Sequence, residues 1–163
     1  MAQKLTKKQA EALLAAYTKA QTAATDQAIA AAAAKQDETV RQATADKQAA
    51  VEQAREEAKR SYDAQTVQRL ADERMIAERV ANLGLFGSGQ HKALADGARR
   101  VWERGAAENK DRQRQAFAAA ETKLATVKAT VAAEKKKTAA DAKKTLAGKI
   151  AEKRLSLDRA VIR

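Results

Sequence analysis

The first 83 residues of this 163-residue chain contain no glycine, and the whole chain contains no proline. These two residues interrupt helices most strongly, whereas the alanine, glutamine, lysine, arginine and glutamate that dominate the stretch favour them. We therefore predict a single helix from about Thr6 to Asn82, which at 1.5 Å per residue would be about 115 Å long. A β fold is excluded because these residues are poor strand formers and turn residues are scarce.

Large apolar side chains are also scarce. Alanine accounts for 43 residues, whereas Leu, Ile, Val and Phe together account for 25, or 15% of the chain. This is below the ~20% at which a globular core becomes hard to assemble. We therefore expect no deep apolar pocket, no catalysis, no cofactor and no small-molecule substrate. Disorder is disfavoured because disordered chains are rich in Pro, Gly and Ser, and this one has no Pro, six Gly and three Ser.

The glycines mark a turn, since five of the six lie in residues 84–105. Segment 82–85 has the form of a helix C-terminus, with Gly84 free to adopt the left-handed conformation. Ser88 can then cap the start of a second helix with its hydroxyl. The sequence predicts a Gly-rich turn over residues 84–89.

The predicted fold is all-α, with two long helices that form a hairpin or a bent rod. A long N-terminal helix occupies residues 1–83, and a basic C-terminal helix occupies residues 90–163. Gly97 and Gly105 lie inside the second helix, where each costs roughly 1 kcal/mol relative to alanine. We expect a kink, a close helix contact or a break over residues 97–106.

Residues of the expected helix seam recur every 11 positions, which predicts coiled-coil-like packing that is straight or slightly right-handed. The first helix has three such rows: Ile29, Val40, Val51 and Tyr62; Ala32, Ala43, Ala54, Gln65 and Ile76; and Gln36, Lys47, Ala58, Arg69 and Val80. The second helix has two weaker rows: Leu124, Lys135, Leu146 and Leu157; and Phe117, Lys128, Ala139, Ile150 and Val161. Because alanine buries little area, we expect a lone hairpin to be marginal and to depend on further copies or a larger assembly.

Positive charge is concentrated in the second half of the chain. Residues 1–83 carry 13 basic and 12 acidic residues, whereas residues 84–163 carry 19 and 9. The excess suits either a solvated helix face or a surface for nucleic acid or an acidic protein. Residues 118–163 contain no aromatic side chain to stack on bases, so a DNA contact would be non-specific. The candidate contact residues are Lys135, Lys136, Lys137, Lys143, Lys144, Lys149, Lys153 and Arg154.

Two further features suggest contact with a protein partner. Leu85 and Phe86 form an apolar pair in the turn, which either packs back against Val80 and Leu94 or binds a partner. Trp102, the only tryptophan, either belongs to the local helix seam or anchors an interface. We retain Leu85, Phe86 and Trp102 as candidate partner-binding residues.

No catalytic, metal or membrane site is predicted. His91 is the only histidine, and no cysteine is present to complete a metal-ligand set with it. Ser88 lacks the strand–turn–helix context of a catalytic nucleophile. Membrane association is disfavoured because no apolar run of about 18 residues occurs, and a helix lying on the surface would insert mainly alanine.

The segment Ala81-Asn82-Leu83-Gly84-Leu85-Phe86-Gly87-Ser88-Gly89, between two alanine- and charge-rich helices, resembles segments in small helical proteins of bacteriophage virion modules. In those proteins an Asn-Leu/Met-Gly-Leu turn and a Ser-Gly step also join two helices. The resemblance implies a multi-copy virion component, made in the host cytoplasm, whose partners are copies of itself or other structural proteins. Two alternatives remain open: a non-specific nucleic-acid-binding protein that uses the Lys-rich helix, and a chaperone-like clamp whose turn grips clients.

Overall fold

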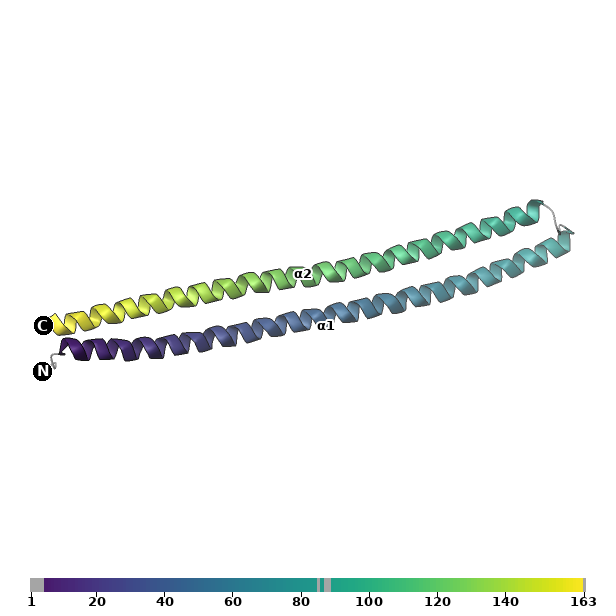
Figure 1. Cartoon of the computed structure of the whole chain (residues 1–163). Coiled ribbons are helices and arrows are strands. Elements are labelled where there is room, and N and C mark those ends of the chain that lie inside the picture. The colour runs from purple at the N-terminus through teal and green to yellow at the C-terminus, as the bar shows by residue number, and fades with distance from the viewer. Residues whose placement is uncertain (1–4, 85, 87–88, 163) are drawn as a thin grey trace. The chain divides into compact units, whose positions relative to one another are not determined.

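The computed structural model consists of two long helices, α1 (Lys7–Leu83) and α2 (Gly89–Ile162), packed against each other as a hairpin (Figure 1). It describes residues 5–84, 86 and 89–162, except for the side chain of residue 162. The predicted all-α fold with two long helices is confirmed, and of the two predicted arrangements the chain adopts the hairpin.

Helix α1 begins with a capping box. The Gln9 backbone N–H donates to Thr6 Oγ1 at 3.3 Å, and the Thr6 backbone N–H donates to Gln9 Oε1 at 2.9 Å. The Ala10 N–H then donates to the Thr6 carbonyl at 3.0 Å. The two bonds between Thr6 and Gln9 satisfy backbone donors that have no partner inside the helix, and the bond from Ala10 is the first regular bond of the helix, which explains why α1 starts here.

Helix α1 ends at Leu83, and the next residue, Gly84, has a φ of +65°. Glycine adopts this left-handed conformation without the steric penalty of a Cβ, as the sequence predicts. The Gly84 N–H donates to the Ala81 carbonyl at 3.3 Å. Leu85 and Ser88 lie outside the described residues, so the predicted cap at Ser88 stays a prediction.

Helix α2 runs without interruption through Gly97 and Gly105, so the break considered over residues 97–106 does not occur. The surrounding strong helix formers tolerate two glycines that each cost roughly 1 kcal/mol. The close helix contact does occur at Gly105, where a Cβ would lie 3.1 Å from Gln65 Nε2. Glycine thereby makes room for the glutamine side chain of α1.

The side chains shielded from solvent follow the 11-residue repeat in both helices. In the predicted rows, all residues are buried or half-buried except Tyr62 in α1 and Lys128 in α2. A further shielded row of α2 was not predicted as a row, because it mixes small and polar residues: Ala98, Asn109, Ala120, Val131, Ala142 and Lys153.

The hairpin divides into two compact units, each of which contains part of both helices. Unit 1 comprises Met1–Ala43 and Thr126–Arg163, and unit 2 comprises Thr44–Ala125. The buried apolar residues are few: Ala10, Val131 and Leu157 in unit 1, and Ala54, Val80, Ala120 and Leu124 in unit 2. Among the described residues, Val80 is the only large side chain that is fully buried, so each unit has a thin core.

Candidate interaction surfaces

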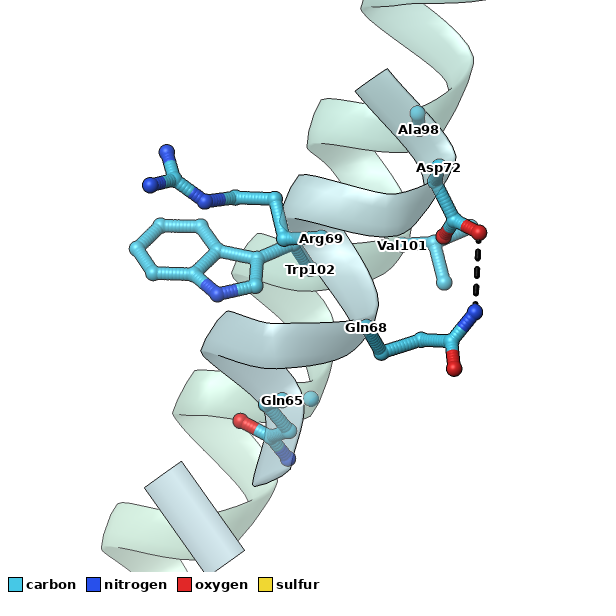
Figure 2. Close-up of a pocket in the computed structure, with 8 residues that line it drawn as sticks. Gln65, Gln68, Arg69, Asp72, Ala98, Val101 and Trp102 are labelled. Atoms are coloured by element: carbon cyan, nitrogen blue, oxygen red, sulfur yellow. Dashed lines mark hydrogen bonds between the residues drawn. The ribbon is translucent and has the colours of Figure 1, made fainter. Parts of the chain in front are cut away.

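Trp102 lies half-buried in the seam of unit 2, between two residues of α1. Its ring meets the Tyr62 ring edge-on, with 6.4 Å between centroids and an angle of 61°. The Arg69 guanidinium lies 5.2 Å from the centroid of the Trp102 ring, and the two side chains project on the same side of the hairpin (Figure 2). Arg69 also approaches Glu73, with 3.6 Å between Nη1 and Oε1. Trp102 therefore packs in the local seam, and its predicted role as an interface anchor stays a prediction.

Several polar atoms around Trp102 are buried without a hydrogen-bond partner among the described residues. They are Trp102 Nε1, Arg69 Nε and Gln65 Oε1. An unmade hydrogen bond to a buried polar group costs about 1–3 kcal/mol, and the N–H of a buried tryptophan usually has an acceptor. This part of the seam consequently contributes less to stability than an apolar core of the same size would.

A shallow groove with a volume of about 200 Å³ lies along this part of the seam, and both Trp102 and Val101 line it. Gln68 and Asp72 of α1 line it, and Gln68 Nε2 donates to Asp72 Oδ1 at 2.8 Å (Figure 2). The Val101 side chain is 70% exposed. The groove has room for an apolar side chain and lacks the depth of a ligand pocket.

Exposed large apolar side chains are concentrated in unit 2. Of ten such residues in the described chain, unit 1 holds only Leu13 and Leu155. The other eight are Tyr62, Val67, Leu70, Met75, Leu83, Phe86, Leu94 and Val101. Single exposed apolar residues are normal on protein surfaces, but this density over a short stretch of both helices suggests packing against a partner.

Of the predicted partner-binding residues in the turn, Phe86 is 70% exposed and Leu85 lies outside the described residues. Phe86 therefore does not close the turn by packing inward. The sequence did not single out Val67, Leu70 or Met75, because they fall outside the 11-residue rows. Large apolar residues that lie outside the 11-residue rows are the sequence signal that could have identified them.

The structure separates the eight predicted basic residues into two groups. Lys135 forms a hydrogen-bonded ion pair with Asp37, and Lys153 Nζ lies 5.7 Å from the centroid of the Tyr17 ring. Both lysines are half-buried in the seam of unit 1, where they join α2 to α1. The remaining six are exposed: Lys136, Lys137, Lys143, Lys144, Lys149 and Arg154.

Charge also differs between the two units. Unit 1 contains 17 basic and 8 acidic residues, whereas unit 2 contains 15 and 13. Unit 1 therefore carries nine of the eleven net positive charges of the chain. The part of the protein with the fewest exposed apolar side chains is thus the most basic part.

Neither helix contains, within its described residues, an apolar stretch long enough to cross a membrane. In the described part of the chain, no group of three or more His, Cys, Asp or Glu residues is placed to hold a metal ion. No family model, curated protein or solved structure matches the chain.

Proposed function

We propose that this protein is a non-enzymatic structural component that assembles in several copies, and that the exposed apolar residues of unit 2 provide its contacts. The observation that carries the proposal is the imbalance in unit 2. Eight large apolar side chains are exposed there, while Val80 is the only large one in the described chain that is fully buried. A chain with this distribution gains more free energy by packing these exposed side chains against a partner than the contacts between its own two helices supply.

The magnitudes support this proposal. Complete burial of a Val, Leu, Phe or Met side chain is worth roughly 1.5–3 kcal/mol. Covering Phe86, Met75 and Val101 would therefore add several kcal/mol, which is comparable to the net stability of many whole domains. Three of the seven buried apolar residues of the seam are alanine, and each of these contributes far less.

A bacteriophage virion is the assembly that we favour, with synthesis in the host cytoplasm and incorporation as a multi-copy part. The support is the resemblance of segment 81–89 to the turns of small helical virion proteins. Partners in such an assembly would be further copies of this chain or other structural proteins.

The test is sedimentation of the purified protein over a range of concentrations, with and without nuclease. We expect a defined oligomer that nuclease does not change. Phe86→Asp and Val101→Asp should weaken it, whereas Leu155→Asp, a matched change at an exposed apolar residue of unit 1, should not. A monomer at every concentration, with a cooperative melt independent of concentration, would contradict the proposal.

A second candidate function is non-specific binding of nucleic acid through unit 1, which the 17 basic and 8 acidic residues of that unit favour. Such binding would weaken linearly with the logarithm of salt concentration, with a slope of about −0.9 for each duplex phosphate contacted. Retention on DNA with a steep slope would favour this function over the structural one.

A further inference from the structure

One side of α2 near the turn carries two exposed apolar side chains with a glycine between them. Leu94, Gly97 and Val101 are three and four positions apart, so they lie on the same side of the helix. Leu94 is 40% exposed and Val101 is 70% exposed. Gly97 is half-buried, and a Cβ at this position would meet no neighbour within 4 Å.

Met75 of α1 lies on the same side of unit 2. Gln68, Asp72 and Met75 are four and three positions apart, which is the spacing of one helix face. Gln68 and Asp72 line the groove beside Val101, so Met75 continues the face of α1 that borders this groove. Its side chain is 62% exposed. We name the four residues of this surface the Gly97 patch: Met75, Leu94, Gly97 and Val101.

Gly97 serves no packing purpose among the described residues. A glycine inside a helix lowers the stability of that helix relative to alanine. At Gly105 the Gln65 side chain occupies the space next to a Cβ, whereas at Gly97 this space is open. A second helix that packs against Gly97 supplies a reason for the glycine, because the missing Cβ lets two backbones approach closely.

We infer that two copies of the chain pack their α2 helices against each other in antiparallel orientation, with a two-fold axis at Gly97. This inference rests on the proposed function, since it names a second copy as the partner. In an antiparallel pair centred here, the numbers of facing residues sum to about 195, so Leu94 of one copy meets Val101 of the other. The two-fold axis repeats the same contact on its other side. The patch is therefore complementary to itself, and that is why its occupant is another copy.

The groove of unit 2 fits the side chain that this arrangement brings to it. The groove has a volume of about 200 Å³, and Ala98, Val101 and Gly105 line it from α2. Leu94 of the other copy lies at the height of Val101, next to the groove. An apolar side chain of that size fills the groove, and each copy offers its leucine to the groove of the other.

The contact is large enough for a specific dimer. Helix α2 begins at Gly89, which faces residue 106 of the other copy, so the two α2 helices overlap over about 18 residues, or about 26 Å. A hairpin face is two helices wide, or about 20 Å. The overlap therefore covers about 500 Å² on each copy and about 1,000 Å² in total, which is the size at which specific interfaces begin.

The charge of unit 1 favours the antiparallel orientation over a parallel one. Helix α2 passes from unit 2 into unit 1 between residues 125 and 126, and unit 1 carries nine net positive charges. In a parallel dimer the two copies of residue 125 would lie side by side, and the charges that follow them would repel each other. In the antiparallel dimer the two copies of residue 125 are about 80 Å apart, which is about ten Debye lengths at 0.15 M salt.

Arg100 and Arg104 border the Gly97 patch on α2, and Asp72 borders it on α1. The two arginines are exposed, and their long side chains reach water at the rim of the contact. Arg100 Nε donates to the Asp96 carbonyl at 3.2 Å, and the Asp72 carboxylate accepts from Gln68 Nε2 at 2.8 Å. The patch can therefore be covered without burying a charge that has no partner.

The first test maps the contact with cysteine pairs, because the chain has no cysteine of its own. Copies carrying Leu94→Cys and copies carrying Val101→Cys are mixed and oxidised. A disulfide needs Cα atoms less than about 7 Å apart. The two copies of either single residue are offset by about 10 Å along the antiparallel helices, so disulfide dimers should contain one copy of each variant. Dimers that form as readily with one variant alone, or the absence of dimers, would overturn the inference.

The second test fills the space at the axis. Gly97→Leu should weaken self-association about tenfold or more in sedimentation, while the urea midpoint of the monomer should not fall, because leucine favours the helix. Gly148→Leu is the matched control, since a Cβ there also meets no neighbour within 4 Å, and it lies in unit 1. The control should leave self-association unchanged. Equal self-association of the two variants would show that no second helix packs at Gly97.

These tests separate failure of the inference from failure of the proposed function. If the unaltered chain stays monomeric at every concentration, both fail. If it assembles, but Gly97→Leu assembles equally well and the mixed cysteine variants form no disulfide, the proposed function stands and the antiparallel contact is wrong. If each cysteine variant forms disulfide dimers alone, the copies pack in parallel, and the inference is likewise wrong.

Discussion

Val80 offers the sharpest test of how the seam of unit 2 is held together. It is the one large side chain in the described part of the protein with no exposed surface, and Val67, on the same helix, is 69% exposed. Val→Ala at either position removes two methyl-sized groups and raises helix propensity by up to about 0.7 kcal/mol. The two variants therefore differ only in burial.

The expected effects have opposite signs. At Val80 the lost transfer free energy is about 1.6 kcal/mol at 0.8 kcal/mol per group, and a cavity adds to it. After the gain in propensity, Val80→Ala should lower the free energy of unfolding by about 1–2 kcal/mol. Val67→Ala should leave it unchanged or raise it by up to about 0.7 kcal/mol.

Urea unfolding followed by circular dichroism at 222 nm measures both changes. With a slope of about 2 kcal/mol per molar urea, near the middle of the usual range, the midpoint for Val80→Ala should fall by roughly 0.5–1 M. All samples are measured at a protein concentration low enough for the chain to be monomeric, because Val67 is one of the exposed apolar residues of unit 2 that we propose as assembly contacts, and assembly shifts apparent stability. If the two variants shift the midpoint equally, residue 80 is not buried in solution and the described seam of unit 2 is wrong.

Three further changes have definite expected outcomes. Gly97→Ala should stabilise α2 by about 1 kcal/mol in a urea melt, because a Cβ there meets no neighbour within 4 Å, and Gly105→Ala should gain less, because its Cβ would crowd Gln65. Thr6→Ala should cost about 1 kcal/mol by removing the cap of α1, which hydrogen exchange of the first helical turn will detect as lost protection. Asp37→Asn removes an ion pair between the exposed Asp37 and the half-buried Lys135 of unit 1, so its cost should be about 1 kcal/mol at low salt and should shrink at 1 M NaCl.

Much of the fold could be predicted from the sequence because helix propensity and the seam repeat agree. Gly84 ends α1 as expected, since a single glycine after a long stretch without one leaves little ambiguity. Rows such as Ile29, Val40 and Val51 were found because an apolar side chain at each step gives a signal at the helix period. Of the alternatives expected over residues 97–106, the close helix contact occurs at Gly105 and the break does not, because the strong helix formers around the two glycines keep α2 continuous.

The interaction surfaces could be predicted only in part. Charge counts identify Lys135 and Lys153 as basic residues, but only the packing of the two helices shows that Asp37 and the Tyr17 ring engage them. The exposed position of Met75 likewise depends on where the partner helix lies. Propensity and periodicity describe one helix at a time, so they do not reveal which side chains the second helix covers.

The net charge of unit 1 gives the proposed assembly a definite salt dependence. Unit 1 carries nine net positive charges, so neighbouring copies repel each other over the Debye length, which is about 30 Å at 0.01 M salt and about 8 Å at 0.15 M. Salt screens this repulsion and does not weaken the burial of apolar side chains of unit 2. Self-association should therefore strengthen from 0.01 to 0.15 M salt and should persist at 1 M, which sedimentation at the three concentrations measures. Association that weakens steadily as salt is added would mean that opposite charges hold the copies together, and would contradict apolar contacts in unit 2 as the basis of assembly.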